Sequence, residues 1–275
     1  MSGVLYVVAT PIGNLDDITR RGSGVLSSVQ MIAAEDTRRT QVLLAEIGAH
    51  QAELVALHTH NEESASRRIV GALHGGMDVA LVSDAGTPLL SDPGFDLVRR
   101  CWQEAIAVVP IPGASAVLAA LSVCPLPCGR FHFEGFLPAK AGQRRTRLKA
   151  LAGFADAVVF FEAPHRVAAC LADLETLAPH RRIMVGREMT KRHESYYCDT
   201  PGAVARMLES GSQLRGEFVL VLEGSDQAAV DIGAERAMAI LAAELPPAQA
   251  ARIGAALLGM DKSTLYELAI RRAKP

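Results

Sequence analysis

The stretch VALVSDAGTP, residues 79–88, joins a short apolar run to a turn of small and polar residues. An apolar run that ends at such a turn is typical of a strand buried on both faces. The same arrangement recurs through the first half of the chain, and helical patterns separate the runs. We predict strands at residues 4–9, 31–34, 54–57, 79–82 and 107–109, with helices at 18–29, 37–47, 62–73 and 93–103. This alternation predicts an α/β fold with a parallel sheet covered by helices on both faces.

The pattern changes after Pro125-Leu126-Pro127, which indicates a domain junction. We predict strands at residues 131–133, 157–161, 183–185, 195–198 and 218–222, and helices at 146–151, 167–177 and 203–208. The run 194–198 and the last strand are close enough in sequence to pair antiparallel, so this sheet should be mixed. From residue 234 onward the pattern is helical, with breaks at 246–247 and 261–263. We therefore predict two αβα domains, 1–124 and 125–225, and a small helix-turn-helix-like module, 234–275.

Composition excludes several classes of protein. With 49% hydrophobic and 21% charged residues, 275 residues can bury a large core, which excludes a disordered chain. The net charge of −2 gives no sign of nucleic-acid binding, although a basic patch on one face is sufficient for it. Five cysteines without zinc spacing argue against disulfides and a metal site. We expect a cytoplasmic protein without a signal peptide or membrane span, since prolines break its most apolar stretch, 105–124.

Small and polar residues follow the ends of several predicted strands. Because ligands bind beyond the carboxyl ends of parallel strands, residues 10–14, 35–38, 83–94 and 112–116 are candidate ligand loops. Simpler explanations exist for three of these loops: a tight turn at 10–14, a helix N-cap at Asp36 or Thr37, and a plain helix start at 112–116. The loop 83–94 has two Asp turns with Gly and Pro, more than one connection needs. The nucleotide-binding patterns GxGxxG and GxxxxGK[ST] are absent.

The second half adds two polar strand ends and one basic run. Residues 161–166 and 186–194 each place a His within a few residues of Glu and Arg, which favours a cleft. Residues 140–149 hold five cations and no carboxylate. Either these cations contact RNA phosphates or they form a solvated helix face. The five are Lys140, Arg144, Arg145, Arg147 and Lys149.

Eight strings in this order resemble the tetrapyrrole-methylase superfamily, the class III S-adenosylmethionine methyltransferases. They are TPIGNLDDIT (10–19), AEDTRRT (34–40), SDAGTPLLSDPG (83–94), PGASA (112–116), EGFLPAK (134–140), EAPHR (162–166), GREMTKRHE (186–194) and RGEFVLVLEG (215–224). Within that superfamily they are similar to the branch that methylates a cytidine ribose 2′-OH in the decoding region of bacterial 16S ribosomal RNA. The resemblance runs from Leu5 to about Gly224, and the C-terminal helices are also similar to that branch.

The resemblance implies S-adenosylmethionine as methyl donor, bound between two α/β domains, and a homodimer acting on the assembled small ribosomal subunit. The residues that match the donor pocket are Pro11, Ser83, Asp84, Ala85, Gly86, Ser115, Ala116, Phe161, Glu188, Met189, Gly216, Glu217 and Phe218. A ribose hydroxyl is weakly acidic, so a base or cation should assist its reaction. The candidates are Glu188, Lys191 and Glu35, with Asp36 and Arg38 as orienting residues.

Two other functions fit parts of the sequence. A corrinoid or porphyrin methylase belongs to the same superfamily, but the strings AEDTR and EAPHR, the basic run and the helical tail disfavour it. A non-catalytic RNA-binding protein on a methylase fold is disfavoured by the polar loops at five strand ends. The C-terminal helices have three interpretations: they serve the RNA substrate, stabilise a dimer, or form an inert appendage.

Overall fold

The computed structural model describes residues 2–210, 214–225 and 232–273. It divides into two compact units. The first holds Met1–Leu148 and Asp156–Gly224, and the second holds Lys149–Ala155 and Ser225–Pro275. The boundaries predicted from sequence, at residues 124 and 225, remain predictions.

The first sheet is parallel throughout, as predicted. Its strand order is β3-β2-β4-β1-β5, and each neighbouring pair runs parallel. The strands are β1 (Leu5–Val8), β2 (Met31–Ala34), β3 (Glu53–Ala56), β4 (Val79–Val82) and β5 (Val108–Ile111). All four residues of β2 and of β4 are buried, because these two strands have a strand on each side and helices on both faces. The apolar run 79–82 is therefore the middle strand of the sheet.

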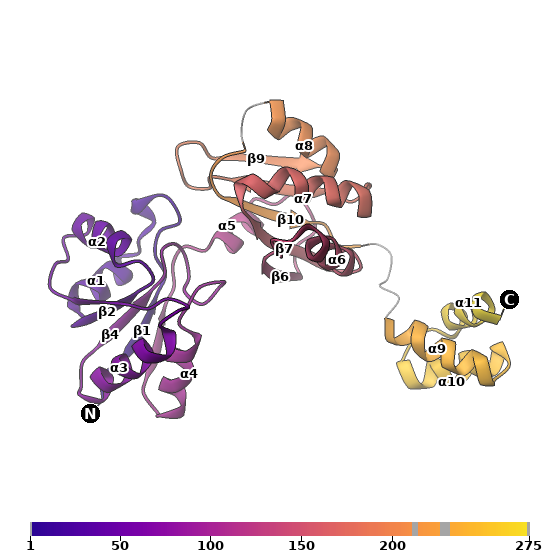
Figure 1. The fold of residues 1–275 in the computed structure, drawn as a ribbon, viewed down its shortest axis with the longest axis horizontal. Helices are drawn as coiled ribbons and strands as arrows, with labels where there is room; N and C mark the ends of the chain where they lie inside the picture. Colours follow the sequence, from indigo (N-terminus) through magenta and orange to yellow (C-terminus); the bar gives the residue numbers. More distant parts are fainter. Residues whose placement is uncertain (1, 211–213, 226–231, 274–275) are drawn as a thin grey trace. The chain divides into compact units, whose positions relative to one another are not determined.

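Helices cover both faces of this sheet, on opposite sides of the strands in Figure 1. Alternate residues of β4 face opposite ways, because successive side chains of a strand alternate. Val79 and Leu81 pack in one core with Ile69 and Leu97, whereas Ala80 and Val82 pack in a second core with Leu26. The four helices are α1 (Arg20–Ser28), α2 (Thr37–Glu46), α3 (Glu62–His74) and α4 (Phe95–Gln103), and a short 3₁₀ helix, η1 (Leu15–Asp17), precedes α1.

The second sheet is mixed, as predicted, with the order β6-β7-β10-β8-β9. Its strands are β6 (Phe131–Phe136), β7 (Ala157–Glu162), β8 (Ile183–Arg187), β9 (Ser195–Asp199) and β10 (Phe218–Leu222). Only the pair β6–β7 is parallel among these neighbours, and the other three pairs are antiparallel.

The predicted pairing of the run 194–198 with the last strand is wrong. β9 pairs with β8, and β10 lies between β7 and β8. Burial explains this order. All five residues of β10 are buried, which suits a central strand, whereas β9 holds no fully buried residue and lies at the edge. Proximity in sequence to the last strand therefore did not decide the pairing.

Helices also cover the second sheet. The helices are α5 (Ala116–Ser122), α6 (Ala141–Leu151), α7 (Pro164–Leu177) and α8 (Pro201–Ser210). α5 packs on the second sheet, where Val117 and Ala120 share a core with Val159 and Val219. α6 begins five residues before the predicted start at Thr146, because the basic residues that precede its apolar positions are good helix formers.

The second unit is helical, as predicted for residues from 234 onward. α9 (Ile232–Glu244), α10 (Pro247–Leu258) and α11 (Lys262–Ala273) enclose a small core that includes Met238, Ala250 and Leu265. The breaks between these helices, residues 245–246 and 259–261, overlap the predicted breaks at 246–247 and 261–263, but Pro247 already begins α10 and residues 262–263 already belong to α11. Within the same unit, Ser225 N–H donates to Phe154 O at 2.8 Å. Among the described residues, no helix has the length and apolar character that crossing a membrane requires.

Candidate active site

A cavity of about 430 Å³ opens in the first unit at the carboxyl ends of the parallel strands. Its lining comes from the loops after β1, β2 and β4, from the start of α5, and from segments of the second sheet. The lining residues are Ile12, Glu35, Arg39, Asp84, Ala85, Gly86, Thr87, Leu90, Ser91, Asp92, Ser115, Ala116, Val117, Phe136, Phe161, Glu162, Ala163, Pro164, Met189, Gly216, Glu217, Phe218 and Val219.

The loops after β1 and β4 are joined by a two-way backbone pairing. Thr10 N–H donates to Gly86 O at 2.9 Å, and Gly86 N–H donates to Thr10 O at 3.0 Å. The Thr10 hydroxyl also donates to Ser83 O at 3.1 Å. Gly86 has φ +83°, a left-handed conformation that favours glycine. This pairing holds Ala85 exposed at the cavity wall.

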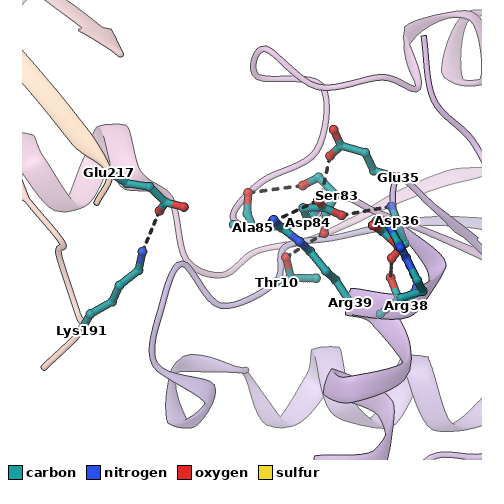
Figure 2. A network of polar contacts seen from close by, with 11 residues as sticks. Thr10, Glu35, Asp36, Arg38, Arg39, Ser83, Asp84, Ala85, Lys191 and Glu217 are labelled. Atoms are coloured by element: carbon teal, nitrogen blue, oxygen red, sulfur yellow. Dashed lines mark hydrogen bonds and ion pairs between the residues drawn. The ribbon is translucent and has the colours of Figure 1, made fainter. Parts of the chain in front are cut away.

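Carboxylates connect the ends of β2 and β4, as Figure 2 shows. Glu35 Oε2 accepts the N–H of Asp84 at 3.2 Å, and Asp84 Oδ1 accepts the N–H of Asp36 at 3.0 Å. Arg39 forms an ion pair with Asp84, Nη1 to Oδ2, at 3.1 Å. The Asp36 side chain accepts the N–H of Arg38 and so caps α2. Glu35, Asp84 and Arg39 therefore line the cavity, whereas Asp36 closes a helix end beside it.

The loop between β4 and α4 carries an unusual backbone and a perturbed carboxyl group. Leu89 and Ser91 have φ +72° and +74°, conformations that cost side-chain-bearing residues energy and gather at functional sites. Asp92 follows them and lines the cavity. Burial raises the pKa of Asp92 to about 6, Glu35 and Asp84 add to that rise, and a hydrogen bond from Ser83 opposes it.

A compact charge cluster lies on the side formed by the second sheet. Glu188 Oε1 accepts both the Glu217 N–H, at 2.9 Å, and the Lys191 ammonium, at 3.0 Å. Lys191 also donates to Glu217 Oε2 at 3.0 Å, a contact visible in Figure 2. Gly216 has φ +97°, and a Cβ there would lie 2.4 Å from Glu188 Cδ. The cluster therefore depends on a glycine at residue 216.

The electrostatics of this cluster oppose a role in proton transfer. Burial acts to raise the pKa of Glu188, but hydrogen bonds from Lys191 and from Glu217 N–H together hold it below its usual range. Burial acts to lower the pKa of Lys191, but its two carboxylate partners raise it. The pair is thereby stabilised as carboxylate and ammonium.

An aromatic wall completes the cavity. The ring of Phe161 lies 5.4 Å from that of Phe136 and 5.2 Å from that of Phe133, measured between centroids. Met189 is buried beside them in the core of the second sheet. Apolar surface thus faces the carboxylates of the first sheet, a composition suited to a ligand that is both apolar and cationic.

The structure brings most of the predicted site residues together. Those that line the cavity are Glu35, Asp84, Ala85, Gly86, Ser115, Ala116, Phe161, Met189, Gly216, Glu217 and Phe218. Predicted residues outside the lining are Pro11, Ser83, Asp36, Arg38, Glu188 and Lys191. Ser115 also caps α5, so residues 112–116 form the helix start that was the simpler explanation of this loop.

Several lining residues were not among the predicted site residues. Arg39, Asp92, Phe136 and Glu162 all lie within the strings that carry the family resemblance. These four residues could have been identified from the sequence, because each of the strings that hold them lies at the end of a predicted strand or directly after it. Burial and neighbouring charge, which distinguish Asp92 from the other acidic residues, depend on the folded structure.

The basic run, which lies on α6 and on the residue just before it, divides into two groups. Arg144 is buried and pairs with Asp173, Nη2 to Oδ2 at 2.8 Å. Arg147 donates from Nε and Nη2 to the two carboxylate oxygens of Glu134, both at 2.6 Å. The remaining three have exposed side chains: Lys140, Arg145 and Lys149. RNA contact by this run stays a prediction, and the exposed group is the one available for it.

Comparison with known sequences identifies the family of this fold and cavity. Residues 4–205 match the family Tetrapyrrole (Corrin/Porphyrin) Methylases, and residues 226–273 match the RsmI C-terminal HTH domain. Ribosomal RNA small subunit methyltransferase I of Xylella fastidiosa is 47% identical over 268 residues, covering 96% of this chain and 98% of that protein. The protein of the same name from Escherichia coli O157:H7 is 44% identical over 274 residues, covering 98% and 96%.

Solved structures agree on the fold. A cobalt precorrin-4 methyltransferase, CbiF, has a TM-score of 0.59 at 16% identity, covering 79% of this chain and 94% of its own. Uroporphyrin-III C-methyltransferase from Thermus thermophilus, complexed with S-adenosylhomocysteine, has a TM-score of 0.57 at 16% identity, covering 80% and 97%. The chain therefore belongs to the tetrapyrrole (corrin/porphyrin) methylase family and carries the C-terminal domain of the RsmI type.

Proposed function

We propose that this protein uses S-adenosylmethionine to methylate the ribose 2′-OH of a cytidine in the decoding region of 16S ribosomal RNA, within the small subunit. The observation that carries the proposal is similarity to ribosomal RNA small subunit methyltransferase I at 42–47% identity over nearly the whole chain. The fold alone does not select this substrate, because structural neighbours with the same fold act on corrinoids and porphyrins.

The cavity fits the proposed methyl donor in size and chemistry. Its volume of about 430 Å³ is within the range of small-molecule sites, about 300–1,000 Å³. Phe136, Phe161 and Met189 offer apolar surface, and Glu35 and Asp84 offer negative charge. When bound, S-adenosylmethionine supplies an activated methyl group on a positively charged sulfur. The acidic wall complements that charge, and the loop around Ala85 permits close approach of the backbone.

The protein contributes mainly alignment. Methyl transfer is an in-line displacement at an already activated carbon, so holding the hydroxyl close and at the correct angle removes much of the barrier. The loop pairing between Thr10 and Gly86 and the Glu35–Asp84 contact fix the wall against which the donor would lie. The Glu188–Lys191 pair supports the opposite side through Glu217. We assign this pair a structural role, since its charges satisfy each other.

RNA binding is assigned to exposed cations and to the C-terminal helices. Arg145 and Lys149 lie on α6 and Lys140 directly precedes it; all three are exposed and can contact phosphates. The match of residues 226–273 to the RsmI C-terminal HTH domain supports a role for α9–α11 in the same binding. We also infer a homodimer, and the cytoplasm as its compartment because ribosomal subunits are the proposed substrate.

One experiment tests the proposed reaction. Tritiated S-adenosylmethionine is incubated with the protein and one of three acceptors: small subunits lacking the modification, naked 16S RNA, or a corrinoid. We expect transfer to the subunits alone, located on a ribose by nuclease digestion and mass spectrometry. Transfer to the corrinoid would contradict the proposal. Sedimentation of the same preparation measures whether it is a dimer.

A further inference from the structure

The segment between β4 and α4 forms one wall of the cavity, and its backbone is strained. Leu90, Ser91 and Asp92 line the cavity. Leu89 and Ser91 have positive φ angles, +72° and +74°. Such conformations cost side-chain-bearing residues energy and persist only where the surrounding structure holds them in place. Residues 89–94, the cavity loop, therefore need partners elsewhere in the fold.

The cavity loop ends in a helix that does not cap itself. Gly94 is the N-cap residue of α4 and has no side chain to offer the first N–H groups of that helix. Its φ is +119°, and a Cβ at this position would lie 2.8 Å from Leu81 Cδ2. Both observations favour glycine here, so the structure supplies the acceptor from another helix.

That acceptor is Glu62, the first residue of α3. Its Oε1 accepts the N–H of Gly94 and the N–H of Asp96, both at 2.9 Å. A carboxylate at this end of α4 also complements the positive end of the helix dipole. The two helices lie side by side (Figure 1), with Ile69 of α3 and Leu97 of α4 in one core. Glu62 is half-buried and lies outside the cavity lining, so it acts on the cavity through the cavity loop.

The connection before α3 holds Glu62 in place. Asn61 Oδ1 accepts the N–H of His58 at 2.8 Å. Asn61 Nδ2 donates to the O of Ala56, the last residue of β3, at 2.9 Å. These bonds tie the start of α3 to the end of a strand. The Glu62 carboxylate therefore joins the cavity loop to the first sheet.

The middle of the cavity loop lies against the second sheet. A Cβ on Gly135, in β6, would lie 2.8 Å from Ser91 Oγ, and Gly135 has φ +73°. Phe136 follows Gly135 and lines the cavity. A shift of the cavity loop would therefore change its spacing from the aromatic wall of the cavity.

We propose that Glu62 is a positioning residue, whose hydrogen bonds to Gly94 and Asp96 hold the cavity loop in the conformation that binds S-adenosylmethionine. This inference rests on the proposed function and adds a residue to it. Without the carboxylate the strained loop can relax, so a smaller fraction of the protein is ready to bind, and the apparent affinity falls by that fraction. Donor at saturation restores the loop, so kcat should change little.

Three variants of Glu62 separate reach from charge, and two others serve as controls. Glu62→Ala removes the acceptor. Glu62→Gln keeps an oxygen at the same reach without the charge, whereas Glu62→Asp keeps the charge on a shorter side chain. Glu63→Ala is the matched control, because Glu63 is the next residue of α3, is exposed and pairs with Arg67. Ile69→Val, in the core beneath the same helix, controls for lost stability.

Three quantities are measured. Calorimetry gives donor affinity, methyl transfer to unmodified small subunits gives kcat and the KM for the donor, and mass spectrometry gives amide hydrogen exchange in peptides that cover residues 89–97. We expect Glu62→Ala and Glu62→Asp to weaken donor binding and raise this KM about tenfold, with kcat within about threefold. Exchange in the cavity loop should become faster in both variants. The Gln variant and both controls should keep donor affinity within about threefold and the loop exchange of the wild type.

Contrary results overturn the role of Glu62. Wild-type affinity or wild-type loop exchange in Glu62→Ala would show that the cavity loop does not depend on this carboxylate. An equal loss of affinity in Ile69→Val would assign the effect to stability, and an equal loss in Glu62→Gln would assign it to charge. If Glu62→Ala does not fold, Glu62→Asp takes its place in each comparison. Wild-type protein that binds no S-adenosylmethionine contradicts the proposed function, and the role of Glu62 fails with it.

Discussion

The carboxylate of Glu35 accepts a hydrogen bond from the backbone N–H of Asp84, with 3.2 Å between Oε2 and the nitrogen. Asp84 in turn accepts the N–H of Asp36 at 3.0 Å. These residues follow neighbouring strands, β2 and β4, so the exchange joins two loops that are far apart in sequence. It presents negative charge at one wall of the cavity, where a cationic donor would bind.

Replacing Ala85 tests that wall. Ala85→Trp places an indole in the cavity, and we expect S-adenosylmethionine affinity to fall by more than about 100-fold in calorimetry. Ala85→Ser is the control, because it keeps a small side chain and should bind the donor normally. Circular dichroism confirms that both variants are folded. Unchanged affinity in a folded Trp variant would place the donor elsewhere.

Gly216 tests the opposite wall. Its φ of +97° and its closeness to Glu188 mean that Gly216→Ala strains the backbone and displaces a paired carboxylate. We expect a loss of about 1–2 kcal/mol in the free energy of unfolding, measured with urea, and weaker donor binding. Gly142→Ala, in helix α6 with open space around the new Cβ, should instead stabilise by about 0.5–1 kcal/mol. Equal effects at both sites would contradict this account.

Replacing the exposed cations on α6 and just before it tests RNA contact. The triple variant of Lys140, Arg145 and Lys149 to Ala should weaken subunit binding and reduce its salt slope by about 2, with donor affinity unchanged. A double variant of Arg67 and Arg68 to Ala, on α3, controls for loss of positive charge. A salt slope equal to that of the wild type would show that the basic run, residues 140–149, is only a solvated helix face.

Arg144 should behave differently from those three residues. Arg144→Ala leaves the carboxylate of Asp173, which is 14% exposed, without its closest cation. We expect about 3 kcal/mol of destabilisation in urea denaturation. A variant as stable as the wild type would show that this ion pair is dispensable.

Truncation after Ser225 tests the C-terminal helices. This cut keeps the Ser225 N–H that donates to Phe154 O. We expect the shortened protein to remain folded and dimeric and to bind S-adenosylmethionine, but to lose methylation of small subunits. Conversion to a monomer in sedimentation would favour a dimer-stabilising tail. Full activity would show that the helices are an appendage.

Asp92 also affects stability, and the sign follows from its raised pKa. The folded state binds its proton more tightly than the unfolded state, so Asp92 favours folding increasingly as the pH falls from about 6 towards 4. At pH 7 the charged carboxylate is unfavourable. Asp92→Asn should therefore stabilise the protein by about 1 kcal/mol at pH 7 and by less at pH 4.5. The figure for pH 7 is kept small because Asp92 is partly exposed and solvent screens its charge. Urea denaturation at both pH values measures the difference. A destabilised variant at pH 7 would contradict the raised pKa.

Much of the fold is local information in the sequence. A short apolar run such as Val79–Val82 can both hydrogen-bond its backbone groups and bury its side chains only in a sheet covered by helices. Hydrophobic periodicity and turn residues therefore identify the strands and the α/β class. Because parallel strands end at one edge, polar residues after those strands were predicted to meet. Glu35, Asp84 and Ser115, which follow β2, β4 and β5, do line one cavity.

Tertiary structure decided what depends on distant partners. The central place of β10 follows from burial between β7 and β8, which its nearness in sequence to β9 did not reveal. Arg144 and Arg145 are adjacent in sequence and both pair with Asp173, yet the packed structure buries the side chain of Arg144 and leaves that of Arg145 exposed. The raised pKa of Asp92 requires desolvation and two carboxylates from other loops. Residue types and spacing determine which elements form, whereas burial and charge pairing exist only once separate segments pack together.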